Sequence, residues 1–138
     1  MGGAAAVCAG GCSGPEQATL DAGHIITILP DPVDGILVLP FSDFEVLRTT
    51  KGWVRGTPPA WGKPVIVINT GPSYVALAAG CTHLGCGVNY ADSLDLLLCP
   101  CHGAEYSLAG DVIRGPATMP LVVYSVTADK VSVRVTLG

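Results

Sequence analysis

Two short segments hold most of the side chains that can bind a soft metal. Residues 81–86 read Cys-Thr-His-Leu-Gly-Cys and residues 99–103 read Cys-Pro-Cys-His-Gly, so four of the six cysteines and two of the three histidines are concentrated there. The closely spaced thiol and imidazole pairs are Cys81 with His83 and Cys99 with His102. Two thiolates with two imidazoles select zinc, copper or an iron–sulfur centre and exclude hard ions such as calcium.

The pair of segments CTHLGC and CPCHG resembles the Rieske iron–sulfur proteins, and specifically their high-potential branch, which carries a disulfide. The resemblance covers about residues 81–120. It includes Gly115, Pro116 and Ala117, which resemble the proline loop that covers the cluster in that family. The resemblance therefore implies a [2Fe-2S] cofactor and one-electron transfer.

The resemblance also implies a ligand set. Cys81 and Cys99 would hold the inner iron, and His83 and His102 would hold the outer iron through ring nitrogens. Because two neutral imidazoles replace two thiolates, the cluster carries less negative charge and is easier to reduce. Rieske centres as a class lie at about −150 to +300 mV, against about −400 mV for plant-type all-cysteine clusters.

Further residues near the cluster receive roles by the same resemblance. Cys86 and Cys101 would form a disulfide that ties the two loops together. The Tyr106 hydroxyl would donate to a cysteine sulfur, and Leu84 would form part of an apolar tip where partners dock. Ala104 stands where the family usually has a serine that donates to a bridging sulfide. Donors to sulfur stabilise the reduced cluster, so this chain is expected to have a lower potential than relatives with both donors.

Several functions compete within the family. Ferredoxins and aromatic-ring oxygenases generally lack the disulfide pair, so the resemblance favours the iron–sulfur subunit of a quinol:cytochrome c oxidoreductase of the bc or bf type. Oxidation acidifies the ligand imidazoles, which couples electron uptake to proton uptake and suits a quinol. The expected partners are cytochrome b with quinol and a c-type cytochrome, with His102 contacting the quinol hydroxyl. The alternatives are the small subunit of an arsenite oxidase-like molybdoenzyme and a free periplasmic carrier. In each role the chain relays an electron and is not a complete enzyme alone.

A structural zinc site is the alternative outside the family. A set of two cysteines and two histidines is common for structural zinc, and the spacing permits it. A zinc site leaves Cys86 and Cys101 unexplained, so the iron–sulfur interpretation is favoured.

Composition limits the other possibilities. The chain has 138 residues, a net charge of −4 and 13% charged residues, so it is one domain without a basic surface for nucleic acid. A hydrophobic share of 49% excludes a disordered chain. No run of 18 apolar residues occurs that would predict a membrane-spanning helix.

Residues 1–20 begin with a small, glycine-rich, apolar stretch that contains Cys8 and Cys12. The stretch is interpreted as a residual export signal or a flexible tail. Export, by a twin-arginine route suited to a preloaded cofactor, would place the protein in the periplasm or on the extracytoplasmic face of a membrane. Membrane association through a missing N-terminal segment or a lipid anchor is left open.

From residue 24 onward, short β-branched runs alternate with Gly and Pro turns, which predicts an all-β fold. The expected architecture is a Rieske-like antiparallel sandwich or incomplete barrel, with a base of residues 21–79 and 118–138 and an inserted two-loop cluster-binding subdomain of residues 80–117. His24 is expected to be an ordinary half-buried strand residue, and Trp53 and Trp61 to pack a loop onto the barrel. The predicted strands are His24–Leu29, Ile36–Leu39, Phe44–Arg48, Val65–Asn69, Tyr74–Ala79, Leu94–Leu98, Leu121–Val126 and Val131–Leu137.

Overall fold

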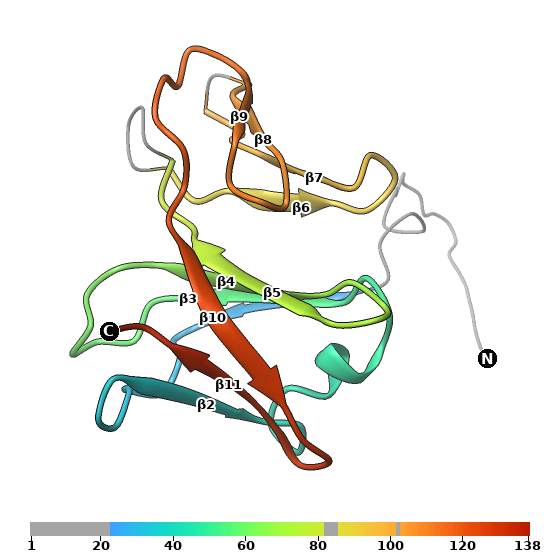
Figure 1. The fold of residues 1–138 in the computed structure, drawn as a ribbon, viewed down its shortest axis with the longest axis vertical. Helices are drawn as coiled ribbons and strands as arrows, with labels where there is room; N and C mark the ends of the chain where they lie inside the picture. Colours follow the sequence, from blue (N-terminus) through green and yellow to red (C-terminus); the bar gives the residue numbers. More distant parts are fainter. Residues whose placement is uncertain (1–22, 82–85, 102) are drawn as a thin grey trace, which may run out of the picture.

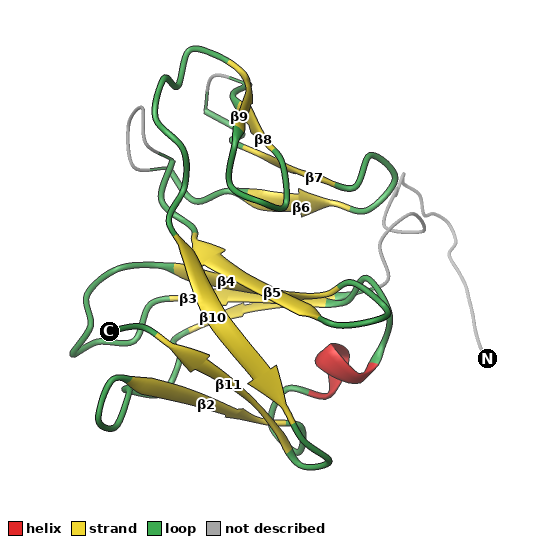
Figure 2. Ribbon diagram, viewed as in Figure 1, coloured by secondary structure: helices red, strands yellow, loops and turns green. Residues whose placement is uncertain are grey.

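The computed structural model describes residues 23–81, 86–101 and 103–138, which form two β-sheets (Figures 1 and 2). The seven-stranded sheet has the spatial order β1 (His24–Thr27), β3 (Trp53–Gly56), β4 (Val65–Asn69), β5 (Tyr74–Ala78), β10 (Val123–Ala128), β11 (Ser132–Thr136) and β2 (Ile36–Pro40). The four-stranded sheet has the order β6 (Asn89–Ala91), β7 (Leu96–Leu98), β8 (Glu105–Tyr106) and β9 (Val112–Arg114). A 3₁₀ turn, Glu45–Arg48, lies between β2 and β3. The all-β prediction is confirmed.

The small sheet is an excursion of the chain between two neighbouring strands of the large sheet (Figure 1). β5 and β10 pair directly, with Leu77 opposite Val123, although the whole of the small sheet separates them in sequence. The Ala78 N–H donates to the Val122 carbonyl at 2.8 Å where the two strands leave the sheet. Both ends of the excursion are therefore fixed to two neighbouring strands in the middle of the large sheet, called the base below, which limits where the small sheet can lie.

β4 supports two hydrophobic cores at once. Ile66 and Ile68 belong to the core between the two sheets, while Val65 and Val67 belong to the core inside the curled large sheet. Successive side chains of a strand point to opposite faces, so a strand covered on both faces reads as a continuous apolar run. The sequence Val-Ile-Val-Ile-Asn of β4, buried throughout, fits this description.

The core between the sheets is where the base meets the small sheet. Ile66, Ile68 and Leu77 of the base pack there with Leu97 of β7 and Tyr106 of β8. Leu97 and Tyr106 are fully buried and occupy directly opposite register positions on their neighbouring strands. The small sheet is thus held to the base mainly by apolar burial, which contributes about 25 cal/mol per Å² removed from water.

The predicted strands agree with the structure unevenly. The strand Val65–Asn69 is found with those bounds, and six others are found with shifted ends. The predicted strand Phe44–Arg48 is wrong, because Phe44 and Leu47 are both buried at the three-residue spacing of a 3₁₀ turn. The strands that the sequence reading did not anticipate are β3, β6, β8 and β9.

Three further expectations need correction. The β1–β3 pair is parallel, whereas every other strand pair in the described ranges is antiparallel. His24 is exposed rather than half-buried, and its ring stacks on the Trp53 ring with centroids 4.5 Å apart. Trp53 lies in a strand and not in a loop, because its indole fills the core between the sheets. Trp61 does pack from a loop onto the core of the large sheet.

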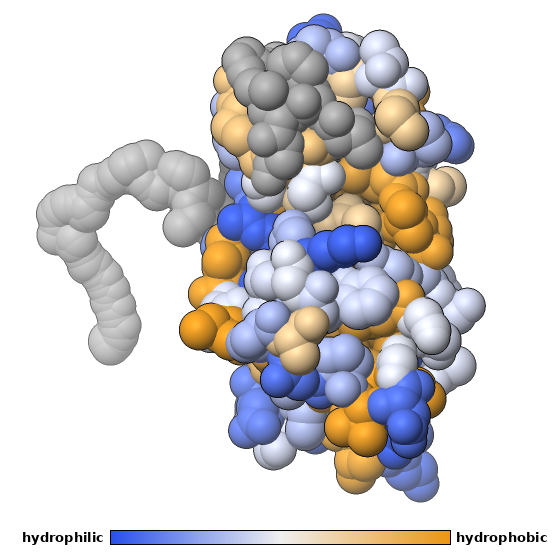
Figure 3. All heavy atoms as spheres, turned by 90° about the vertical axis from the view of Figure 1, so that its left-hand side faces the viewer, coloured by the Kyte–Doolittle hydropathy of each residue, from blue (hydrophilic) through white to orange (hydrophobic). Residues whose placement is uncertain are grey.

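The surface of the described residues mixes polar and apolar side chains, as Figure 3 shows for one side of the molecule. Its exposed large apolar residues are Ile26, Ile28, Val33, Leu94, Ile113, Met119, Val122, Val123 and Val131. Among the helical segments that could be searched, none has the length and apolar character needed to cross a bilayer.

Leu97→Ala tests whether the core between the sheets holds them together. Leu97 is fully buried, so the cavity should lower the free energy of unfolding by about 2–5 kcal/mol. Leu94→Ala, in the neighbouring turn and 60% exposed, is the matched control and should change it by less than about 0.5 kcal/mol. Denaturant unfolding followed by circular dichroism measures both, and equal effects would contradict the packing described here.

Candidate functional site

The first cysteine-containing loop, residues 81–86, is closed by backbone hydrogen bonds at its base. Gly80 and Gly87 form an isolated antiparallel bridge just outside the loop. The Cys81 N–H donates to the Cys86 carbonyl at 2.6 Å, and the Val88 N–H donates to the Ala79 carbonyl at 2.8 Å. Cys81 is buried at the end of the segment that leaves β5. These contacts therefore hold the first and last residues of the loop next to each other, at the end of the segment that follows β5.

The second loop, residues 99–104, is closed in a similar way between β7 and β8. The Cys99 N–H donates to the Ala104 carbonyl at 2.8 Å, and the Gly103 N–H donates to the Cys99 carbonyl at 3.0 Å. Gly103 has φ +79°, a left-handed conformation that glycine adopts without steric cost. The backbone conformation therefore explains why the CPCHG segment ends in glycine. Cys99, at the start of this segment, is buried.

A disulfide joins the two loops. Cys86 and Cys101 are bonded, with Cα atoms 6.4 Å apart, so the pairing expected from the resemblance is present. The sulfur of Cys99 lies within 4.8 Å of both disulfide sulfurs. Cys81 and Cys99 keep their thiols and are both buried. The disulfide thus lies beside one of the two cysteines that are available as ligands.

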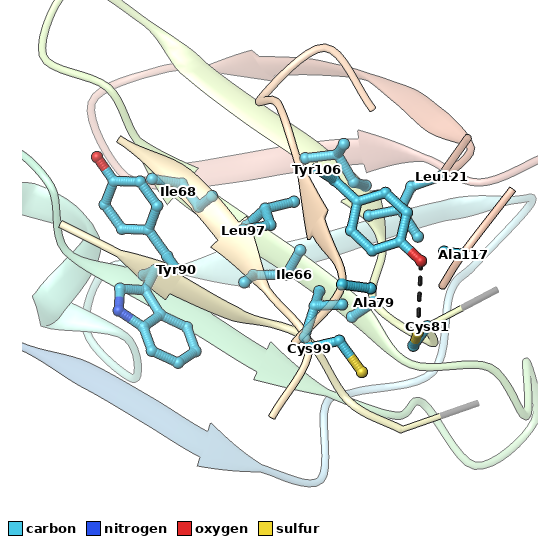
Figure 4. Packing of buried hydrophobic residues seen from close by; sticks show 14 residues of the cluster. Ile66, Ile68, Ala79, Cys81, Tyr90, Leu97, Cys99, Tyr106, Ala117 and Leu121 are labelled. Atoms are coloured by element: carbon cyan, nitrogen blue, oxygen red, sulfur yellow. Dashed lines mark hydrogen bonds between the residues drawn. The ribbon is translucent and has the colours of Figure 1, made fainter. Parts of the chain in front are cut away.

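Tyr106, in β8 of the small sheet, directs its hydroxyl toward the sulfur of Cys81. The oxygen and sulfur are 3.4 Å apart, and the tyrosine is fully buried (Figure 4). Once Cys81 is a thiolate ligand, the hydroxyl is the donor, because a thiolate has no proton to give. Ala117 and Leu121 pack around this contact in the same buried cluster.

The expected proline loop follows β9. The peptide bond between Gly115 and Pro116 is cis, Gly115 and Pro116 are exposed, and Ala117 is buried in the cluster that contains Cys81 and Tyr106. The segment therefore contributes one buried side chain next to Cys81.

The remaining predicted site residues divide into two groups. Ala104 immediately precedes β8 in the chain. It is fully buried, in the cluster that also contains Cys81 and Cys99. His83, His102 and Leu84 lie outside the described residues. The structure thus brings together the two cysteines, the disulfide and the tyrosine.

The acidic residues near the loops are engaged in structural contacts. Asp92 lies 3.3 Å from the Lys51 ammonium, and Glu105 lies 4.0 Å from Arg114. The Tyr90 hydroxyl donates to Asp95 at 2.5 Å. Burial, and then this hydrogen bond, raise the pKa of Tyr90 well above its usual value. Tyr90 therefore stays protonated at neutral pH and holds the β6–β7 hairpin.

Two basic residues of the base reach the small sheet and were missed by sequence reasoning. Arg55 of β3 donates to the Val88 carbonyl at 2.8 Å and to the Asn89 side chain. Lys51 bonds to Asp92. Isolated basic residues more than 30 positions from their partners leave no local signal in a sequence.

Comparison with known proteins agrees with this geometry. The family model "Rieske [2Fe-2S] domain" matches residues 47–125. The cytochrome b6-f complex iron-sulfur subunits of Chlorobaculum thiosulfatiphilum and Chlorobaculum tepidum are 52% and 50% identical over 60 and 62 residues. These alignments cover 44% and 45% of this chain, and the chain spans about a third of each relative, 33% and 34%.

Solved structures show the same fold. The plasma membrane Rieske protein of Synechocystis PCC 6803 has a TM-score of 0.56 and 31% identity, covering 70% of this chain and 94% of that one. The ferredoxin–oxygenase complex of carbazole 1,9a-dioxygenase contains a chain with a TM-score of 0.61 at 24% identity, covering 75% of this chain and 94% of that one. That second likeness concerns the fold alone.

The chain belongs to the Rieske [2Fe-2S] family. The cofactor of that family is a [2Fe-2S] cluster, and the described residues fit it. Two buried thiols stand on two closed loops, a hydroxyl is aimed at one sulfur, and a disulfide fixes the loops to each other. Thiolates of this kind are the ligands that iron–sulfur clusters require.

Tyr106→Phe should lower the reduction potential, because it removes a hydrogen bond to the Cys81 sulfur that would strengthen as a cluster bound there gains negative charge. A differential of about 1 kcal/mol corresponds to roughly 40 mV for a one-electron couple. Ala104→Ser is the complementary variant and should raise the potential by adding a donor. Protein voltammetry measures both, and a fall or no change for Ala104→Ser would overturn the donor argument.

Removing the disulfide should loosen the site. A Cys86→Ser/Cys101→Ser double variant opens a link between residues 15 positions apart. In the chain-entropy model a loop of this length is worth around 3 kcal/mol. The melting temperature should fall and the reduction potential should shift, because the two loops lose their fixed relative position. An unchanged potential and melting temperature would show that the bond has no such role.

Proposed function

We propose that this chain carries one electron through a [2Fe-2S] cluster as the iron–sulfur subunit of a quinol:cytochrome c oxidoreductase-type complex. Cys81 and Cys99 would hold one iron, and His83 and His102 would hold the other. The observation that carries the proposal is the Cys86–Cys101 disulfide between the two loops, with a buried cysteine at the start of each loop. This arrangement belongs to the branch of the family that serves such complexes.

The described residues support that role in distinct ways. The bound cluster would supply a one-electron redox couple. Tyr106 would donate its hydroxyl proton to the Cys81 sulfur, and Ala117 and Leu121 would keep water from that contact. The disulfide would hold the two loops in a fixed relative position. A rigid site needs little rearrangement when charge changes, which favours rapid electron transfer.

The histidines would add proton transfer. A ligand imidazole keeps one ring nitrogen directed away from the metal, and its pKa depends on the charge of the metal centre. His102, in the second loop, is proposed to meet the quinol hydroxyl, and Leu84 to form part of the apolar docking tip. One electron of the quinol would pass to the bound cluster and one hydroxyl proton to the His102 imidazole, and a c-type cytochrome would then accept the electron.

The sequence relatives support the choice of complex. The two Chlorobaculum relatives are iron-sulfur subunits of cytochrome b6-f complexes, and the Synechocystis protein is a plasma membrane Rieske protein. By that analogy we propose cytochrome b with quinol as the donor side and an extracytoplasmic location after twin-arginine export. Residues 80–117 would be the cluster-binding subdomain and residues 21–79 with 118–138 the base.

Low-temperature electron paramagnetic resonance of the dithionite-reduced protein tests the cluster assignment. A histidine-ligated [2Fe-2S] centre should give a rhombic signal with an average g value below that of an all-cysteine cluster. Its potential should fall with rising pH as the ligand imidazoles lose protons, and stopped-flow mixing with a reduced quinol analogue should reduce it. A protein that binds zinc, or that gives an all-cysteine signal, would overturn the proposal.

The partner is tested separately. A cytochrome b reading frame beside the gene, with quinol-dependent reduction of a c-type cytochrome by the assembled complex, is the expected result. A neighbouring molybdopterin subunit, with reduction by arsenite, would instead support the arsenite oxidase alternative. Reduction by neither would indicate a free carrier.

A further inference from the structure

Arg55 links the large sheet to the strand that leads out of the first loop. It lies on β3, and its Nη1 donates to the Val88 carbonyl at 2.8 Å and to Oδ1 of Asn89. Val88 is buried, and its own N–H is bonded to the Ala79 carbonyl across the base of the loop. The guanidinium therefore holds Val88 and Asn89, the second and third residues after Cys86.

Gly87 explains how the guanidinium can approach so closely. A Cβ placed on Gly87 would lie 2.8 Å from Cζ and 2.9 Å from Nη1 of Arg55. Gly87 pairs with Gly80, and the Cys81 N–H is bonded to the Cys86 carbonyl next to that pair. Arg55 is thus packed against the backbone that closes the loop, at the end that carries the disulfide.

The charge of Arg55 is not cancelled by these partners. A carbonyl and a side-chain amide are neutral, so both hydrogen bonds leave the positive charge in place. Burial lowers the pKa of Arg55 from its usual value, but a guanidinium still carries its proton at neutral pH. A half-buried charge acts on its neighbours through less water than a fully exposed one.

We propose that Arg55 is a positioning residue of the cluster site, which clamps the disulfide end of the first loop and places a fixed positive charge next to it. The inference rests on the proposed cluster. A fixed positive charge favours the reduced, more negative cluster, so Arg55 raises the reduction potential. The clamp also keeps Cys81 and Cys86 in register with the base.

Lys51 supplies a matched control. Like Arg55, Lys51 is a positively charged residue of the base whose side chain reaches the small sheet. Its ion pair, however, is with Asp92 at the β6–β7 turn. Asp92 is five residues beyond Gly87 along a segment that includes extended β6, or about 16 Å at strand spacing. That separation exceeds the screening length of about 8 Å at physiological ionic strength. Its charge is also paired with a carboxylate, whereas among the described residues Arg55 bonds to a carbonyl and a side-chain amide.

The test compares Arg55→Gln, Arg55→Lys, Gly87→Ala and Lys51→Gln in the cluster-loaded protein. One measurement is the midpoint potential, and the other is hydrogen exchange by mass spectrometry of a peptide covering residues 79–89. Arg55→Gln should lower the potential and speed exchange roughly tenfold, because it loses the charge and a hydrogen bond to the loop backbone. Arg55→Lys keeps the charge but not the planar guanidinium, so exchange should rise with a smaller fall in potential.

Gly87→Ala tests the same contact without removing the arginine. Its new methyl group would push the guanidinium away, so exchange should increase and the potential should fall. Lys51→Gln should leave both quantities unchanged. The proposal is overturned if Arg55→Gln alters neither quantity, or if Lys51→Gln shifts the potential as much. The two proposals can fail independently. If the unmodified protein gives no Rieske resonance signal, the proposed cluster is refuted. Hydrogen exchange of residues 79–89 in the Arg55 variants still tests whether Arg55 holds the loop.

Discussion

The connection between two loops that are separate in sequence is the constraint on which the site depends. The Cys86–Cys101 disulfide makes that connection directly, while backbone hydrogen bonds close each loop at its first cysteine. Cysteine thiolates repel each other when they converge, so the loops need a covalent or packed support that does not depend on the metal. The disulfide supplies this support, and Cys86 lies two and three residues before the residues that Arg55 contacts, Val88 and Asn89.

The packing below the loops extends this constraint into the base. β4 faces both cores, so one strand of the large sheet places side chains under the small sheet and inside the large one. Tyr106 shows the consequence, because it fills the core between the sheets and still brings its hydroxyl to 3.4 Å from the Cys81 sulfur. A closely packed interior leaves few alternative positions for such a ring. The side chain that fills the core therefore also contacts the Cys81 sulfur.

The sequence predicted the elements that carry a strong local pattern. Val65–Asn69 was found with its expected bounds, since a continuous β-branched run has few other interpretations. Phe44–Arg48 was predicted as a strand, although its apolar spacing also fits a 3₁₀ turn. Only the packing of these side chains in the folded protein distinguishes the two. β8 could not be predicted, because a strand of two residues is too short to show any periodicity.

The residue types in the two cysteine-containing segments determined the donor chemistry, and their family resemblance predicted the Cys86–Cys101 pairing that the structure contains. Those features could be recognised because the motif residues are close together in the chain. The tertiary structure alone decided that Arg55 reaches Val88 and that Lys51 reaches Asp92, 33 and 41 positions away. The physical reason is that such contacts depend on where two sheets cross, and sheet packing is set by the summed burial of many side chains rather than by local sequence.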